Sequence, residues 1–174
     1  MEATKKFKQA CEDEKLFACG IIGPGNMAMA IVAGLIKAEK FKGEEILISG
    51  TRNESFRKWE HLKVNTTLDN LEVITLHNLR SKFMKVSFQV FQKCRLIFLC
   101  IKPDKLRSVA QPIASFFLEQ PADNRRFANK TLVSILAGIS IESLTKAFHS
   151  LDIAIIRAMP NTFVPFNSFE YFIL

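Results

Sequence analysis

Two features of the sequence predict an α/β fold with a Rossmann-like, mainly parallel sheet and helices on both faces. Short apolar segments alternate with segments of helical periodicity, and a glycine-rich turn follows the first apolar segment. Such alternation is typical of parallel strands joined by right-handed helical crossovers. The chain has 174 residues, 48% of them hydrophobic. That length suits one domain of roughly 100–200 residues, which can bury a core without disulfides or metal.

The apolar segments are expected to form buried strands because they are short and lie between polar or helical stretches. The predicted strands cover residues 16–22, 45–49, 64–67, 95–101, 130–136 and 152–158. The predicted helices cover residues 26–40, 54–62 and 103–118, and a further helix follows Ser140. Pro103 suits the first turn of its helix, where its missing N–H costs little, and Ser140 is a good N-terminal cap.

The charge pattern argues against a nucleic-acid partner. The chain carries 24 Lys and Arg against 17 Asp and Glu, a net charge of +7. Acidic residues separate the basic ones, so the sequence contains no basic stripe of the kind that binds nucleic acid. A small phosphorylated ligand matches this charge equally well.

The cysteines and an uncharged segment near the amino terminus indicate the cellular compartment and whether the chain crosses a membrane. None of the four cysteines has C-x-x-C spacing or a neighbouring His, so we expect free thiols, no metal and an intracellular, cytoplasmic protein. Residues 16–36 contain no charge, which is long enough for a membrane span. Gly23-Pro24-Gly25 interrupts them, and two elements joined by a tight turn are therefore expected instead of a span.

The segment Gly23-Pro24-Gly25-Asn26-Met27-Ala28 reads G-x-G-x-x-A between a predicted strand and a predicted helix. In this context Gly23 permits a sharp turn and Gly25 lets the backbone approach a pyrophosphate. The free N–H groups at the helix N-terminus would then face the phosphates. The pattern favours a dinucleotide site over an ordinary tight turn.

The end of the second predicted strand favours NADP(H) over NAD(H). NAD sites usually place an acidic residue there to bind the ribose 2′-hydroxyl. Here the first acid is Glu54, whereas Ser49, Thr51 and Arg52 offer donors for a 2′-phosphate. Arg suits phosphate geometry. Alternatively, Arg52 is a solvated residue near a helix start.

Four ordered blocks resemble the pyrroline-5-carboxylate reductase family. The first is the glycine turn just described, and the second is similar to the family's F-L-A-V-K-P. The third is similar to V-S-x-A-A-G-V-S, and the fourth matches R-x-M-P-N-T. In this chain the last three blocks occupy residues 98–103, 133–140 and 157–162. The resemblance implies reduction of Δ1-pyrroline-5-carboxylate to L-proline with NAD(P)H, in a homo-oligomer.

The same resemblance assigns positions around the cofactor, residue by residue. Those near the pyrophosphate are Gly23, Pro24, Gly25, Asn26 and Met27. Those near the adenosine ribose are Ser49, Gly50, Arg52 and Asn70. The ribose and nicotinamide side would be lined by Cys100, Ile101, Lys102, Pro103, Ala137 and Gly138. Asn161 and Thr162 would lie near the substrate, and no catalytic residue is assigned.

The chain departs from the family at two places, and these departures shape the expected domain organisation. We expect a flexible leader at 1–15, a dinucleotide-binding domain at 16–162 with an atypical insertion at 73–89, and an atypical tail at 163–174. Nothing matches the family's C-terminal helical dimerisation domain, which we expect to be absent. Residues 73–89 and the tail are interpreted as translated introns; a basic surface insertion is the alternative for 73–89.

These departures affect the expected function. A truncated reductase with little or no activity is expected, because the helical domain supplies part of the family's substrate site. The first alternative is a non-catalytic NADPH-binding module. The second is a related imine or hydroxyacid reductase.

Overall fold

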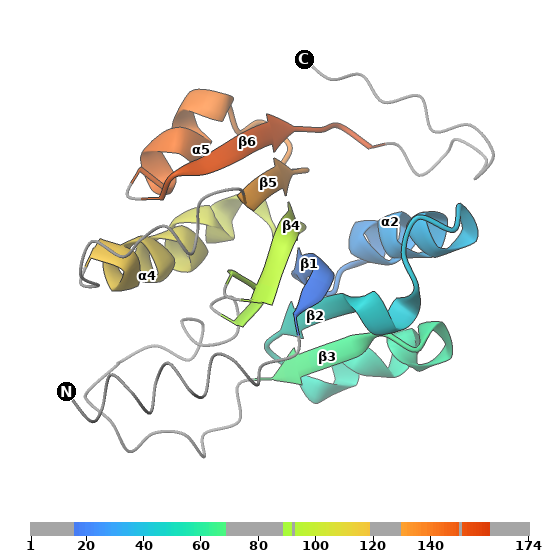
Figure 1. Cartoon of the computed structure of the whole chain (residues 1–174). Helices are drawn as coiled ribbons and strands as arrows, with labels where there is room; N and C mark the ends of the chain where they lie inside the picture. The colour runs from blue at the N-terminus through green and yellow to red at the C-terminus, as the bar shows by residue number, and fades with distance from the viewer. Residues whose placement is uncertain (1–15, 69–88, 92, 119–129, 150, 161–174) are drawn as a thin grey trace, which may run out of the picture.

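A computed structural model describes residues 16–68, 89–91, 93–118, 130–149 and 151–160 of the chain. In this part of the chain six parallel strands form one sheet with helices on both faces (Figure 1). The predicted fold class is therefore confirmed. The elements along the chain are β1 (Phe17–Ile22), α2 (Asn26–Lys37), η1 (Gly43–Glu45), β2 (Ile46–Gly50), η2 (Asn53–Leu62), β3 (Asn65–Leu68), β4 (Cys94–Leu99), η4 (Pro103–Lys105), α4 (Leu106–Leu118), β5 (Lys130–Ser134), α5 (Ile141–Ala147) and β6 (Ile153–Arg157).

The predicted helices that begin at residues 26, 103 and 140 are present, the first two with a local difference. Helix α2 ends at Lys37, three residues before the predicted end at residue 40. Glu39, just beyond it, takes a left-handed φ of 53°. Helix α4 is preceded by the single 3-10 turn of η4, which begins at Pro103. Ser140 caps α5 as predicted, its hydroxyl accepting a hydrogen bond from the Ser143 N–H at 3.1 Å.

The segment predicted as a helix at 54–62 is a 3-10 helix, η2. Its apolar residues Phe56, Trp59 and Leu62 recur every third residue, and all three pack into the same hydrophobic cluster. Because a 3-10 helix has three residues per turn, this spacing aligns them in one row. Trp59 is fully buried in that row, which anchors η2 to the sheet.

The strand order β3-β2-β1-β4-β5-β6 places β1 in the middle of the sheet. The chain runs outward from β1 to β3, then crosses back beside β1 to start β4. Two hydrophobic clusters form on the two faces: one includes side chains of α4 and α5, the other side chains of α2 and η2. The crevice where the strand order reverses, at the carboxyl ends of β1 and β4, is where such sheets bind ligands.

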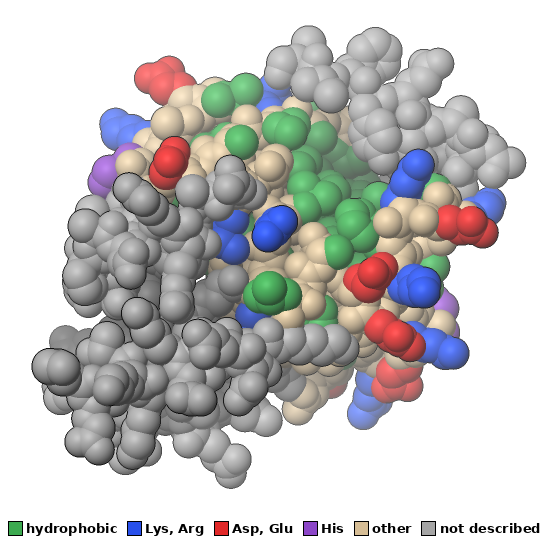
Figure 2. Space-filling model, viewed as in Figure 1, with side chains coloured by type: hydrophobic (Ala, Val, Ile, Leu, Met, Phe, Trp, Pro, Cys, Tyr) green, Lys and Arg blue, Asp and Glu red, His purple; other side chains and the backbone are tan. Residues whose placement is uncertain are grey.

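One row of apolar side chains crosses the sheet from the covered half to an exposed edge. It runs in register from Ile48 through Ile21, Phe98 and Val133 to Ile156. Ile48 and Ile21 are fully buried beside α2 and η2, whereas Ile156 on β6 is 36% exposed. Figure 2 shows hydrophobic side chains gathered between α2 and β6. Within the described residues, the cluster that includes α2 and η2 extends along this row as far as Phe98, and exposure rises from 8% at Val133 to 36% at Ile156.

Several predictions fall outside the described residues. These are the leader at 1–15, the insertion at 73–89 apart from Gln89, and the tail at 163–174. Gln89 accepts a hydrogen bond from the Thr67 hydroxyl at 2.7 Å. Among the helices described, none combines the length and apolar character needed to cross a membrane.

Candidate functional site

The turn after β1 holds the first glycine in a conformation that other residues rarely adopt. Gly23 has a φ of +101° and donates its N–H to the Ser49 carbonyl at 3.1 Å. A Cβ atom at this position would lie 2.7 Å from the Cys100 carbonyl oxygen. Both the positive φ and the close approach of β4 therefore require glycine here.

Gly25 has a different role in the same turn. It is the N-cap of α2 with an extended backbone, at φ −74° and ψ 179°. A Cβ atom built on Gly25 would fit without a clash: beyond its chain neighbours it would meet only the Cys100 carbonyl oxygen, at an ordinary contact distance of 3.9 Å. The chain's own packing does not require this glycine. The space fits an approaching ligand, as expected of the second glycine in a dinucleotide turn.

The N-terminus of α2 is arranged to attract an anion. Its N-cap provides no side-chain hydrogen bond, and its first turn contains no acidic residue. The leading N–H groups of a helix have no partner within the helix, and the helix dipole adds a partial positive charge there. A pyrophosphate placed against Gly25 and Asn26 would meet these groups, so the residues present fit a dinucleotide.

A cleft of about 220 Å³ opens beside this turn at the carboxyl ends of β1, β2 and β4. Its lining comes from the three strand ends and from η4 and α4: Ile22, Gly23, Pro24, Gly25, Ser49, Gly50, Thr51, Cys100, Ile101, Lys102, Lys105 and Val109. The cleft therefore lies at the reversal of strand order, where the fold predicts a nucleotide.

The end of β2 forms one wall of this cleft. The buried Ser49 hydroxyl donates to the Ile21 carbonyl at 3.3 Å, so it ties β2 to β1. A Cβ atom on Gly50 would lie 2.8 Å from Pro24 and 2.9 Å from Phe56, so this glycine allows the turn to pack against β2. Thr51 lines the cleft, and Arg52 is exposed at the start of η2.

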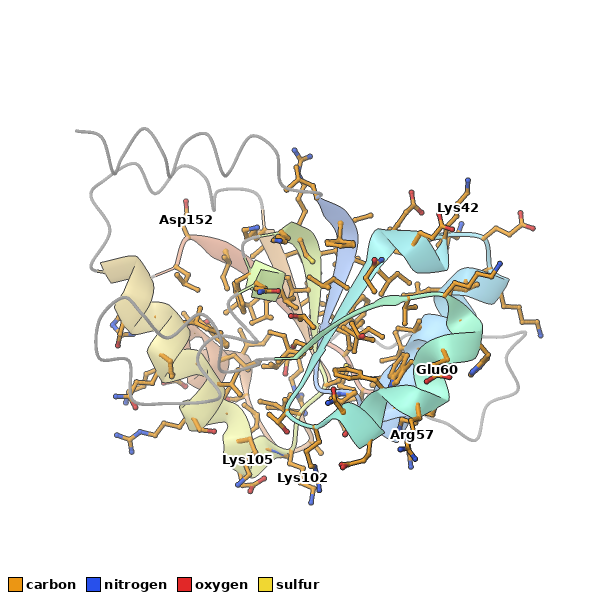
Figure 3. All side chains as sticks on the ribbon, turned by 90° about the horizontal axis from the view of Figure 1, so that it is seen from below. Lys42, Arg57, Glu60, Lys102, Lys105 and Asp152 are labelled. Atoms are coloured by element: carbon orange, nitrogen blue, oxygen red, sulfur yellow. The ribbon has the colours of Figure 1, made fainter. Side chains whose placement is uncertain are left out.

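The end of β4 forms the opposite wall and carries positive charge. Lys102 and Lys105 both line the cleft, and Lys105 pairs with Asp104 at 3.2 Å. Figure 3 shows both lysines at one end of the sheet, opposite the end that carries Lys42 and Asp152. Burial raises the pKa of the Cys100 thiol to about 12. Cys100 is therefore a neutral wall residue, without a reactive thiolate.

The structure brings together most of the predicted cofactor residues, but not all. Asn26 and Met27 at the start of α2, Arg52 before η2 and Pro103 at the start of η4 do not line the cleft. Ala137 and Gly138 form an exposed turn after β5, with Gly138 at a φ of +74°, and they do not line the cleft either. Asn70, Asn161 and Thr162 lie outside the described residues.

Sequence reasoning missed four residues that belong to this region. Ile22, Lys105 and Val109 line the cleft, and Lys58 donates a hydrogen bond to the Asn26 side chain at 3.0 Å. The spacing of Lys102 and Lys105, three residues apart at a helix start, is a signal that could have identified Lys105. Lys58 lies on η2, outside every motif, and carried no such signal. In the described part of the chain no cluster of His, Cys, Asp or Glu could bind a metal.

A glycine turn between a central parallel strand and a helix, with a basic cleft at the strand-order reversal, defines a Rossmann-type dinucleotide-binding domain. The sequence model of the family described as "NADP oxidoreductase coenzyme F420-dependent" matches residues 18–138. The chain belongs to this family.

The curated relatives confirm the resemblance to pyrroline-5-carboxylate reductases. The chain is 34% identical over 147 residues to the enzyme of that name from Synechocystis, and 30% identical over 141 residues to that from Haemophilus influenzae. It is 31% identical over 152 residues to pyrroline-5-carboxylate reductase 3 of Bos taurus. These matches cover 81–87% of this chain but only 41–43% of the relatives. The chain thus spans less than half the length of these relatives.

Solved structures confirm the fold. A pyrroline-5-carboxylate reductase from Coxiella burnetii matches with a TM-score of 0.60 at 23% identity, over 85% of this chain and 45% of that one. The Plasmodium falciparum pyrroline carboxylate reductase, solved with NADP bound, matches with a TM-score of 0.52 at 22% identity, over 84% and 43%. At these identities the likeness extends to the fold alone.

Proposed function

We propose that the chain binds NADP(H) in the cleft between β1, β2 and β4, as the dinucleotide-binding part of a reductase that converts Δ1-pyrroline-5-carboxylate to L-proline. The observation that carries this proposal is the unfilled space at Gly25, where a Cβ atom would meet only one atom at 3.9 Å, beside the start of α2 at the reversal of strand order. The pyrroline-5-carboxylate reductase names of the curated relatives support the substrate.

The residues of this chain would hold and orient the dinucleotide. Gly25 and Asn26 at the start of α2 would present backbone N–H groups to the pyrophosphate, and Lys102 and Lys105 would add positive charge from the facing wall of the cleft. Ile22, Ile101 and Val109 provide apolar cleft walls that exclude water. When bound, the nicotinamide supplies the hydride that the imine carbon accepts. Because a protonated imine is already electrophilic, orientation is the main demand on the protein.

We further propose that NADP(H) is preferred to NAD(H). Thr51 lines the cleft and the exposed Arg52 follows it, while no acid precedes Glu54 after β2. An arginine can bind a 2′-phosphate with two parallel hydrogen bonds, whereas an acidic residue would repel it.

The remaining assignments rest on the four sequence blocks. We propose that Ala137 and Gly138 approach the nicotinamide side of the cofactor and that Asn161 and Thr162 contact the substrate. Gly138 supports this by leaving open space: a Cβ atom there meets nothing within 4 Å.

One titration tests the proposal. Trp59 is the only tryptophan of the chain and is buried against β2, so it can transfer excitation energy to bound NADPH. We expect saturable NADPH emission on tryptophan excitation, reversed by excess NADP⁺. An assay of NADPH oxidation with Δ1-pyrroline-5-carboxylate follows, with proline as the measured product. Absence of saturable NADPH binding would overturn the proposal.

The same two measurements separate the reductase from a binding module. Proline formation by the purified chain supports the reductase. Binding without turnover favours a module that needs further chain or a partner for catalysis, which is consistent with its covering 41–43% of the relatives' length.

A further inference from the structure

Lys58 is fixed at the start of α2 from a different element. Its ammonium Nζ donates to Asn26 Oδ1 at 3.0 Å, across 32 positions of sequence, and both side chains are exposed. Asn26 is the first residue of α2, directly after Gly25. This hydrogen bond therefore places a positive charge beside the N–H groups that form one side of the candidate site.

That position is electrostatically unfavourable in the ligand-free protein. The N-terminus of a helix carries a partial positive charge, which favours acidic side chains and disfavours basic ones. In α2 no acidic residue lies in the first turn to offset it, and the N-cap provides no side-chain hydrogen bond. The Lys58 ammonium and the positive end of the α2 dipole thus lie close together, and the first turn of α2 contributes no acidic side chain to offset them. A bound anion would stabilise this arrangement.

From this we propose that Lys58 binds the diphosphate of the dinucleotide, an inference that rests on the proposed function. The positions implied by the family resemblance do not include Lys58, and it lies outside the four sequence blocks. Lys58 does not line the cleft itself, but its charge at the start of α2 would complement that of Lys102 and Lys105, which line the cleft at the N-cap and the end of η4. The diphosphate would then meet a cation from η2 at the start of α2 and the two cations that follow β4.

The location favours the diphosphate over the 2′-phosphate. Lys58 is bound to the first residue of α2, where the diphosphate is expected. The 2′-phosphate belongs near the end of β2, where Thr51 and Arg52 lie. Because NADH and NADPH share the diphosphate and differ in the 2′-phosphate, their affinities distinguish the two contacts.

Arg57 provides a matched control for the test. It is an exposed cation on the same element, one residue from Lys58, and it projects from η2 in Figure 3. It lies away from the cleft, among residues that line a separate hollow against β3. Lys58→Met and Arg57→Met therefore change the net charge equally but remove different local contacts.

We expect Lys58→Met to raise the dissociation constants of NADPH and NADH to a similar extent, by about threefold to fivefold, the size of effect measured for exposed charge pairs. Arg57→Met should change either dissociation constant by less than about twofold. Without ligand, Lys58→Met should raise the midpoint of thermal unfolding, because it removes the repulsion at α2. Inorganic pyrophosphate should raise the midpoint more in the parent chain than in Lys58→Met.

The outcomes separate this inference from the proposed function. Equal losses in the two variants, a loss confined to NADPH, or no loss in Lys58→Met would overturn the role of Lys58 while leaving cofactor binding intact. If the parent bound neither NADH nor NADPH, the proposed function would fail. The pyrophosphate and unfolding measurements would still decide whether Lys58 completes an anion site.

Discussion

Gly23 and the carbonyl of Cys100 approach so closely that a Cβ atom on the glycine would lie 2.7 Å from the carbonyl oxygen. The turn after β1 is thereby packed directly against the end of β4. This contact fixes the position of the candidate phosphate site relative to the second wall of the cleft, which Ile101 and Lys102 continue. The two glycines of the turn consequently have separable roles.

Substituting the first glycine should affect stability. In Gly23→Ala the new methyl group meets the Cys100 backbone, and the residue must keep a φ of +101°. We expect a loss of about 2 kcal/mol in the free energy of unfolding, typical of a non-glycine residue held in such a conformation. Urea unfolding followed by Trp59 fluorescence measures it. An unchanged midpoint would contradict the packing described here.

Substituting the second glycine should affect binding instead. In Gly25→Ala the methyl group fits without a clash, 3.9 Å from the Cys100 carbonyl oxygen, at an ordinary φ of −74°. We expect unfolding within about 0.5 kcal/mol of the parent. The affinity for NADPH should fall at least about tenfold, because the methyl group occupies the space that the pyrophosphate needs. Calorimetric titration of the folded variant checks this, and unimpaired binding would place the pyrophosphate elsewhere.

The proposed cofactor preference can be tested at Arg52. This residue is exposed and is the N-cap of η2, where its side chain makes no capping hydrogen bond. Arg52→Ala should lower the affinity for NADPH about fivefold to tenfold and change the affinity for NADH by less than about twofold, since only NADPH carries the 2′-phosphate. Titration of the variant with each cofactor measures both affinities. Parallel losses for both cofactors would indicate that Arg52 does not read the 2′-phosphate.

The buried thiols should make stability depend on alkaline pH. Burial raises the pKa values of Cys19, Cys94 and Cys100 to about 12 from 9.0. Thiols with raised native pKa values stabilise the fold fully below pH 9, and this contribution declines as the pH rises toward 12. Desolvation lowers the pKa of Lys130, which acts in the opposite direction below its ordinary value of 10.5. The free energy of unfolding should therefore decline less steeply between pH 8 and pH 11 in Cys19→Ala than in the parent chain.

The same burial predicts slow thiol chemistry. With Cys11 replaced by Ser, the three described thiols should react with an aromatic disulfide at pH 8 at least about tenfold more slowly in the native chain than in urea. NADPH should slow the modification of Cys100 further, because this residue lines the cleft. Rapid native reaction of all three would contradict their burial.

Local pattern was sufficient to predict the sheet and the turn. Apolar segments such as residues 95–101 gave the strands, and the glycine turn between strand and helix gave the cleft's first wall. The 3-10 form of η2 was not predicted, although the three-residue spacing of Phe56 and Trp59 matches it. Single-sequence periodicity distinguishes helices from strands more reliably than it distinguishes the two helix types.

Two of the missed site residues, Lys58 and Val109, share a physical cause. Lys58 reaches Asn26 across 32 positions, and Val109 enters the cleft because α4 returns across the end of β4. Such proximity arises from the crossover geometry and leaves no mark in the local sequence. The Ser49 hydroxyl illustrates the converse: the motif predicts a ligand donor, but the hydroxyl already donates to Ile21.

The apolar row that ends at Ile156 also has a colloidal consequence. Burial of exposed apolar surface between two molecules is favourable by about 25 cal/mol for each Å² removed from water. The net charge of +7 makes the molecules repel one another. Salt screens the repulsion and leaves the attraction in place. The osmotic second virial coefficient of the purified chain should accordingly turn from positive to negative as sodium chloride is added, and Ile156→Ser should delay that reversal.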